Sequence, residues 1–264
     1  MQNTLTGTLR LHKNLQSRFA GEARDIIVYL PPQYNSNTDT RYPVLYLHDG
    51  QNLFDAATAF AGNEWGLDEL AEELISTGQI EPLIIVGIYN AGVQRMAEYT
   101  PVRDRRGRGG RARHYAKLIV EDLKPFIDSE YRTLPDTVNT ALGGSSLGGL
   151  VTIYLGLHYP AVFGKLIVMS PSVWWANRAI LREVKRLKKK PQQKIWLDIG
   201  TCEGSNPEHC VRDARMLRDA LLAKGWKLNE DFRFEEDEGA GHNEKAWGYR
   251  MRAALRFLFP PRSA

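Results

Sequence analysis

The sequence of 264 residues contains only two cysteines, Cys202 and Cys210, and no long apolar run. Two cysteines cannot form a disulfide framework across so large a chain, although a local bond between them stays open. Apolar stretches such as residues 83–88 are far shorter than the ~18 consecutive apolar residues of a transmembrane helix. We therefore expect a protein that neither spans a membrane nor has a membrane partner.

The sequence also lacks a strong excess of charge of one sign. It has 35 Lys and Arg against 31 Asp and Glu, for a net charge of +4. This excess is too small to mark a nucleic-acid-binding protein by itself. Residues 1–7 contain no positive residue ahead of an apolar run and no small-residue cleavage site, so we expect a cytoplasmic location.

Short β-branched runs alternate with longer segments of helical period, which is typical of an α/β fold with parallel strands and crossover helices. No repeat or long linker is visible, so residues 1–264 are expected to form one domain. The first two strands precede any helix and should pair as an antiparallel edge of a mostly parallel eight-stranded sheet. Strands are expected at residues 4–11, 25–30, 43–48, 83–89, 137–143, 165–170, 195–200 and 232–236, and helices at 67–76, 112–131, 147–159, 176–189, 207–224 and 245–259.

Residues 90–113 contain a glycine-broken arginine cluster, from Arg103 to Arg113, that cannot lie in a core. We interpret the segment as a surface loop. Two readings stay open for it: a solvated loop without further role, or a loop near the site that attracts anionic substrates. A nucleic-acid role is not expected, because one short cluster lacks interleaved aromatic residues.

The segment Gly144-Ser145-Ser146-Leu147-Gly148 joins an apolar strand to a helical run and fits the pattern G-x-S-x-G. In that pattern the central serine occupies a strained turn between strand and helix. Side chains at the two flanking glycines are expected to collide across the bend. Ser146 is therefore the candidate nucleophile, with Ser145 the weaker serine and a simple helix N-cap the structural alternative.

A serine nucleophile needs a base, and in this fold the order along the chain is serine, acid, histidine. Of the histidines after Ser146, His242 stands in a glycine-rich loop after the last expected strand and is the candidate base. The acid should follow the strand before it. Glu203 lies just past that strand and is favoured, while Asp198 within the strand and Glu208 stay open.

The backbone N–H of Leu147 opens the helix and can stabilise an oxyanion, and the N–H of Gln51, after the third strand, is the expected second donor. Trp174, Trp175 and Tyr89 follow strand ends, where a substrate-binding wall belongs. Ordinary packing is the alternative for all three. The pair His48-Asp49 lacks further spaced ligands, so no metal and no cofactor are expected.

The motifs quoted above, with segments 44–54, 95–101 and 170–175 and the pair Gly241-His242, resemble the putative esterase family of α/β-hydrolases. That family includes esterase D, enterochelin-esterase-like siderophore hydrolases and feruloyl or acetyl-xylan esterases. The resemblance implies an α/β-hydrolase fold, no metal, Ser146 as nucleophile, His242 as base and Glu203 as acid. Arg95 opens one of the shared motifs and is included among the expected substrate-binding residues.

The expected activity is hydrolysis of a small-molecule ester through an acyl-enzyme on the serine, with short-chain, aryl, sugar or siderophore-type esters as candidates, anionic or aromatic in character. Transfer of the same acyl group to an alcohol stays open. A hydrolase-fold binding protein without activity is a further alternative. The sequence gives no oligomeric state.

Overall fold

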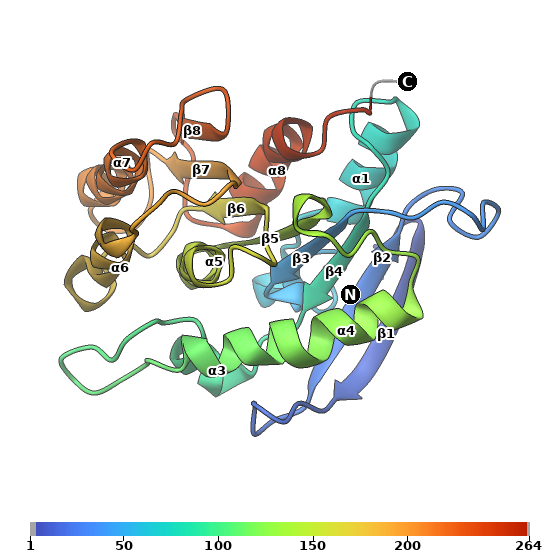
Figure 1. Cartoon of the computed structure of the whole chain (residues 1–264), viewed down its shortest axis with the longest axis horizontal. Helices are drawn as coiled ribbons and strands as arrows, with labels where there is room; N and C mark the ends of the chain where they lie inside the picture. Colours follow the sequence, from blue (N-terminus) through green and yellow to red (C-terminus); the bar gives the residue numbers. More distant parts are fainter. Residues whose placement is uncertain (1–3, 263–264) are drawn as a thin grey trace.

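The computed structural model describes residues 4–262, which contain one eight-stranded sheet with helices on both faces (Figure 1). The strands lie side by side in the order β1-β2-β4-β3-β5-β6-β7-β8. The first two pairings, β1 with β2 and β2 with β4, are antiparallel, and all the others are parallel. The bounds are β1 Thr8–Leu15, β2 Arg24–Leu30, β3 Val44–His48, β4 Ile84–Ile88, β5 Thr140–Ser145, β6 Lys165–Met169, β7 Lys194–Gly200 and β8 Phe232–Asp237.

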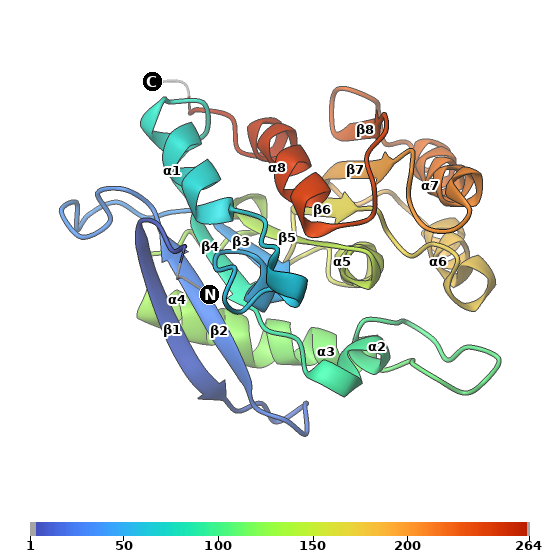
Figure 2. The same ribbon diagram turned by 180° about the vertical axis from the view of Figure 1, so that it is seen from behind.

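The helices enclose the sheet in two layers, because the central strands are buried on both faces and need cover on each. One core cluster joins the sheet to α3, α4, α5, α6 and α7, and a second joins it to α1 and α8 (Figures 1 and 2). The bounds are α1 Leu67–Ser76, α2 Arg95–Glu98, α3 Ala112–Lys117, α4 Lys124–Glu130, α5 Leu147–His158, α6 Trp175–Arg186, α7 Pro207–Leu222 and α8 Glu244–Leu258. A π-helical segment, Leu118–Leu123, makes α3 and α4 continuous.

The expected α/β-hydrolase architecture is confirmed, but two strand bounds were wrong. The first strand covers Thr8–Leu15 rather than residues 4–11, because Thr6 instead donates its backbone N–H to Asp68 Oδ2 at 2.6 Å. The fifth begins at Thr140 rather than residue 137, because Asp136 accepts a hydrogen bond from Asn139 N and caps a short 3₁₀ turn there.

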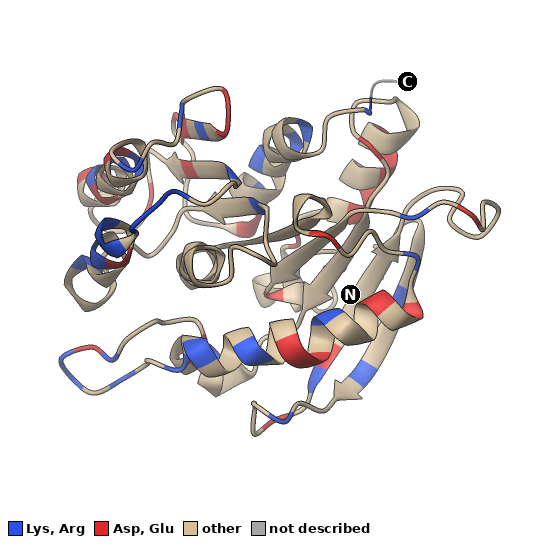
Figure 3. Ribbon diagram, viewed as in Figure 1, with Lys and Arg blue, Asp and Glu red and all other residues tan. Residues whose placement is uncertain are grey.

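The arginine-rich segment projects from the body of the molecule between α2 and α3 (Figure 1). Its tip is closed by Asp104, whose Oδ1 accepts the backbone N–H groups of Arg106 and Arg108 at 2.9 Å each. Arg103 and Arg105 line a hollow together with Arg182 and Arg186 of α6. Figure 3 shows basic positions, in blue, both on the loop and on α6. The segment is thus a surface loop with a defined turn.

Candidate active site

Ser146 stands on the turn between β5 and α5, at the carboxyl edge of the sheet. Its φ of 60° and ψ of −120° are rarely adopted by residues other than glycine, so the turn is strained. The backbone N–H of Ser146 donates to Met169 O at 3.0 Å, and its carbonyl accepts from Ser172 N at 3.0 Å. These two bonds to the segment after β6 hold the turn and leave the hydroxyl free to project.

The structure supports the expected steric role of one of the two flanking glycines and not of the other. A Cβ at Gly144 would lie 3.1 Å from His48 Cδ2, a tight contact, as expected. A Cβ at Gly148 would have only ordinary contacts, the nearest at 3.4 Å, so the expected collision there was wrong. The tight position is Gly149, where a Cβ would lie 2.7 Å from Met169 O, because α5 crosses β6 closely at that point.

Three side chains from distant parts of the chain form a continuous chain of hydrogen bonds. Ser146 Oγ lies 3.0 Å from His242 Nε2, and His242 Nδ1 lies 2.7 Å from Glu203 Oε2. Glu203 follows β7, and His242 lies in the loop between β8 and α8. The imidazole is about one-third exposed, whereas the carboxylate is almost completely buried. With the serine hydroxyl as donor to Nε2, the proton on Nδ1 faces the carboxylate.

Glu203 is fixed by its second oxygen, which the sequence did not reveal. Glu203 Oε1 accepts the backbone N–H of Gly200 at 2.8 Å and the hydroxyl of Ser170. Ser170 Oγ in turn accepts hydrogen bonds from Trp247 Nε1 at 3.0 Å and from Arg250 Nη2 at 2.7 Å. The carboxylate is therefore held on both oxygens, one by this buried network and one by the histidine.

Asp198, the alternative acid, lies within β7 and is completely buried. One of its oxygens accepts from Trp196 Nε1 at 2.6 Å, and the other lies 3.1 Å from Arg250 Nε. Burial raises the pKa of Asp198 to about 6, although the Arg250 guanidinium opposes this shift. Asp198 thus supports Arg250 beneath the site, while Glu203 contacts the histidine. Glu208 lies in the first turn of α7.

The two expected oxyanion donors belong to two different turns, one after β5 and one after β3. Leu147 is the first residue of α5, so its N–H has no acceptor within the helix. Gln51 lies in a 3₁₀ turn after β3, and a Cβ at the preceding Gly50 would lie 2.4 Å from the backbone of Gly87. This turn can therefore pack on β4 only with glycine at position 50.

Asp49 starts that turn in the left-handed conformation, with φ 59° and no hydrogen bond from its side chain to the turn. Its carboxylate instead forms a two-pronged ion pair with Arg95, at 2.7 Å to Nε and 2.8 Å to Nη2, and accepts Asn90 Nδ2 at 2.7 Å. Its backbone N–H donates to the hydroxyl of Tyr99 at 3.2 Å. Arg95 is thus engaged by a carboxylate of the protein itself.

A pocket of about 370 Å³ opens beside the serine. Its lining includes the predicted residues Ser146, His242, Gln51 and Arg95, together with Asp49, Asn52, Phe60, Asn90, Ser145, Glu244 and Trp247. The exposed Phe60 and the half-buried Glu244, whose pKa is raised by burial, were not among the expected site residues. Both belong to loops or helix ends with no distinctive pattern in the sequence.

The three aromatic residues expected to form a substrate-binding wall differ in their burial. Trp174 is 57% exposed, whereas Trp175 is buried and donates its indole N–H to Val102 O at 2.8 Å. Tyr89 is half-buried and packs against the core cluster that contains α1 and α8. None of the three lines the pocket beside Ser146. The hollow next to Arg103 shares no lining residue with that pocket either.

His48 lies below the serine turn and is buried between the rings of Tyr99 and Tyr115. Burial lowers the pKa of His48 to about 3, so it is neutral at physiological pH. In the part of the chain that the structure describes, no group of three His, Cys, Asp or Glu side chains could hold a metal ion. Cys202 and Cys210 are both free thiols. Within residues 4–262, no helix is long and apolar enough to cross a membrane.

Comparison with known proteins finds relatives over almost the whole chain. An uncharacterised protein of Bacillus subtilis, YbbA, is 27% identical over 97% of both chains. Ferri-bacillibactin esterase BesA, also from Bacillus subtilis, is 30% identical and matches 83% of this chain and 80% of its own. A xylanase/feruloyl esterase of Xylanibacter ruminicola is 27% identical, over 94% of this chain but 32% of its own.

Solved structures agree with this result. The crystal structure of the BES protein from Bacillus cereus matches with a TM-score of 0.76 and 25% identity, over 98% of this chain and 97% of that one. The enterobactin esterase FES from Shigella flexneri shares the fold, with a TM-score of 0.77 at 19% identity, over 97% of this chain and 60% of that one. The model of the family described as "Putative esterase" matches residues 17–258. The chain therefore belongs to this esterase family and is a carboxylic ester hydrolase.

Proposed function

We propose that the chain hydrolyses its ester through a covalent acyl-enzyme on Ser146. In this mechanism His242 Nε2 accepts the serine proton as Oγ attacks the carbonyl carbon, and Glu203 stabilises the imidazolium that forms. The protonated histidine then donates to the leaving alcohol. Water, deprotonated by the same histidine, releases the acid and restores the serine. The observation that carries this proposal is the unbroken hydrogen-bond chain from serine through histidine to glutamate.

The oxyanion formed at each attack needs hydrogen-bond donors that are already oriented. We assign this role to the backbone N–H groups of Leu147 and Gln51. Two features support the assignment: the helix of Leu147 directs the positive end of its dipole toward the serine, and Gln51 lines the pocket beside it. Loss of one such donor typically lowers kcat by about 10² to 10³.

The substrate that we propose is a small-molecule ester with an aryl or siderophore-type acyl group. The support comes from relatives, which include enzymes named as feruloyl and siderophore esterases. Of the three aromatic residues expected to form a wall, Trp174 is the exposed one, and we assign it the contact with such a group outside the pocket. A screen of acetyl, butyryl, feruloyl, acetylated-sugar and catecholate-trilactone esters tests this assignment, and a preference for acetylated sugars would contradict it. A cytoplasmic location stays a prediction from the sequence.

The mechanism is tested by replacing each of the two adjacent serines. Ser146→Ala should abolish hydrolysis of p-nitrophenyl acetate and labelling by a fluorophosphonate, because it removes the hydroxyl that donates to His242 Nε2. Ser145→Ala is the matched control, since Ser145 is buried at the end of β5 and lines the same pocket. Ser145→Ala should keep most of the activity. Hydrolysis at the wild-type rate by folded Ser146→Ala would overturn the mechanism.

A further inference from the structure

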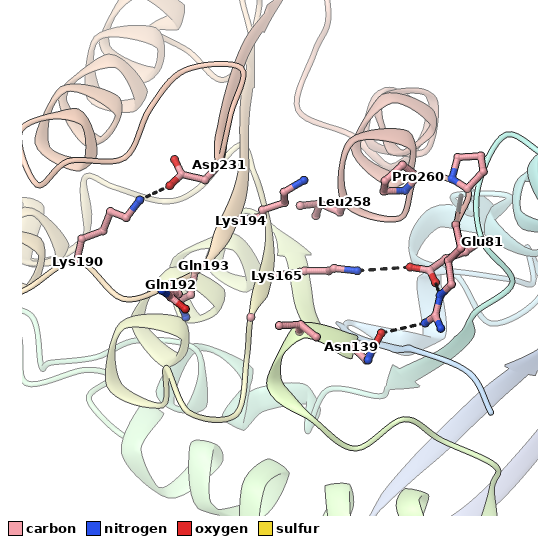
Figure 4. Close-up of a pocket in the computed structure, with 14 residues that line it drawn as sticks. Glu81, Asn139, Lys165, Lys190, Gln192, Gln193, Lys194, Asp231, Leu258 and Pro260 are labelled. Carbon is pink, nitrogen blue, oxygen red and sulfur yellow. Dashed lines mark hydrogen bonds and ion pairs between the residues drawn. The ribbon is translucent and has the colours of Figure 1, made fainter. Parts of the chain in front are cut away.

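A second cavity, of about 690 Å³, opens at the edge of the sheet opposite the serine (Figure 4). Lys165 and Lys194, the first residues of β6 and β7, stand at this amino edge, and Asp231 immediately precedes β8. The proposed catalytic residues follow the carboxyl ends of β5, β7 and β8, at the other edge of the sheet. The cavity therefore has no part in the ester hydrolysis.

Two lysines in this cavity are direct neighbours across the sheet. Lys165 and Lys194 are paired in register on the parallel strands β6 and β7. Like charges directly opposite each other destabilise a sheet. Both ammonium groups lie over rings at the end of α8, with Lys165 4.2 Å from the Phe259 centroid and Lys194 5.4 Å from the Phe257 centroid. Both side chains thus extend toward the same helix.

The carboxylates nearby do not balance these cations. Glu81 lies 3.6 Å from Lys165 Nζ and also binds the guanidinium of Arg262. Lys194 has no ion-pair partner among residues 4–262, and Figure 4 shows its side chain directed into the open space of the cavity. This wall therefore carries three cations and one carboxylate, which is paired with Lys165 and Arg262. The other wall holds the separate ion pair of Lys190 with Asp231.

The electrostatic consequence is visible at Lys165. Burial lowers the pKa of its ammonium group, Glu81 opposes the shift, and Lys194 and Arg262 lower the pKa further. A doubly charged anion between the lysines would neutralise the excess and supply charge-assisted acceptors for hydrogen-bond donors that are partly desolvated. Apolar groups of Leu258, Pro260 and Pro261 line the adjoining part of the cavity.

We propose that this cavity binds a phosphate dianion, either free phosphate or the phosphate group of a small monoester, with Lys194 and Lys165 as its principal contacts. Arg262 borders the same cavity, but its Nε and Nη2 are already bonded to Glu81 and Asn139, so it adds positive charge rather than a principal contact. The organic part of a monoester would lie against the prolines and Leu258. The site is remote from the ester-hydrolysing serine, so occupancy does not block the substrate pocket.

Calorimetric titration of the whole protein with inorganic phosphate and with phenyl phosphate, at ionic strength matched with chloride, tests the proposal. Lys194→Gln should weaken binding by about tenfold, the value of one charge-assisted hydrogen bond. Lys13→Gln is the control, because Lys13 is an exposed lysine on β1 outside the cavity. Tighter binding of phenyl phosphate would identify a monoester as the natural ligand, and equal binding would identify free phosphate.

A second readout separates this role from a structural one. Lys194→Gln should keep the wild-type esterase activity and unfold at the same or a higher temperature, because it removes a like charge beside Lys165. Absence of binding heat in the wild type, or equal affinities in the wild type and Lys194→Gln, would overturn the proposal. A fall in the unfolding temperature of Lys194→Gln in phosphate-free buffer would also contradict it, since Lys194 would then not be an excess charge.

Discussion

Arg95→Met separates two roles for an arginine that lines the substrate pocket. In one role Arg95 binds an anionic part of the substrate directly. In the other it holds Asp49, which starts the turn that carries Gln51. The structure favours the second role, because two nitrogens of the guanidinium are already bonded to the Asp49 carboxylate.

The expected loss of stability in Arg95→Met follows from the burial of the ion pair between Asp49 and Arg95. The Asp49 side chain is only 7% exposed, against 29% for Arg95, so removal of the arginine leaves a buried carboxylate with Asn90 as its remaining side-chain donor. Loss of one partner of a buried ion pair typically costs about 3 kcal/mol or more of the free energy of unfolding. Asp49 is also held in a left-handed conformation that is unfavourable for aspartate. We expect Arg95→Met to destabilise the protein by about 3 kcal/mol on this basis.

The assay compares a neutral ester, p-nitrophenyl acetate, with an ester that carries a carboxylate. If Arg95 positions the turn, kcat falls by about tenfold to 10²-fold for both esters, since an oxyanion donor is displaced rather than removed. If Arg95 binds substrate, KM rises for the anionic ester alone. An unchanged kcat on the neutral ester would refute the positioning role.

Two variants serve as controls in this comparison. Arg95→Lys keeps the charge but cannot reproduce the two-pronged bond, so it should restore part of the stability and less of kcat. Asp49→Asn combined with Arg95→Met removes both charges and should recover stability relative to Arg95→Met alone. If the double variant were as unstable as Arg95→Met alone, the unpaired Asp49 carboxylate would not be the cause of the lost stability.

Two further outcomes are expected, one for the buried carboxyl of Asp198 and one for the adjacent residues Trp174 and Trp175. Burial raises the pKa of Asp198 from 3.8 to about 6, so the free energy of unfolding is highest below pH 3.8 with respect to this group and falls as the pH rises to about 6. In denaturant titrations the wild type should lose on the order of 2 to 3 kcal/mol relative to Asp198→Asn between pH 3.8 and 7, and a constant difference would contradict this. Trp175→Ala should lower the free energy of unfolding by about 3 to 5 kcal/mol, because Trp175 is buried. Trp174→Ala should change the free energy of unfolding by less than about 1 kcal/mol, because Trp174 is exposed, and it should raise KM for aryl esters. Equal effects of the two tryptophan variants on thermal unfolding would refute the distinction.

The positions of the central strands and the serine turn could be predicted because they leave local patterns in the sequence. The run of buried residues in β4 and the glycine-rich strand–turn–helix segment around Ser146 each specify their structure within a few residues. His242 was selected by the chain order serine, acid, histidine and by its place in the loop after the last expected strand. The predicted strand bounds were less accurate where a side chain takes a backbone hydrogen bond that a neighbouring strand would otherwise form. Asp68, for example, accepts the backbone N–H of Thr6.

The supports of the site could not be predicted, because they depend on contacts with no local signature. Ser170, Trp247 and Arg250 converge on Glu203 from β6 and α8, and the hydrogen bonds that join Ser170 to α8 span 77 and 80 positions along the chain. The difference in burial between Trp174 and Trp175 could not be predicted from the sequence either. Adjacent and identical in type, they differ in burial because only Trp175 packs under the loop carbonyl of Val102.

The buried network also explains why glutamate suits the proposed acid position in this chain. One carboxylate oxygen must reach His242 in the loop before α8, while the other accepts the N–H of Gly200 and the hydroxyl of Ser170 within the protein. Because Glu203 lies in the turn beyond β7, one of its carboxylate oxygens contacts His242 and the other contacts Gly200 and Ser170. Arg250 adds positive charge 3.5 Å from the inner oxygen and lies 3.1 Å from Asp198. The two buried carboxylates therefore share one guanidinium, which leaves the outer oxygen of Glu203 with the histidine as its hydrogen-bond partner.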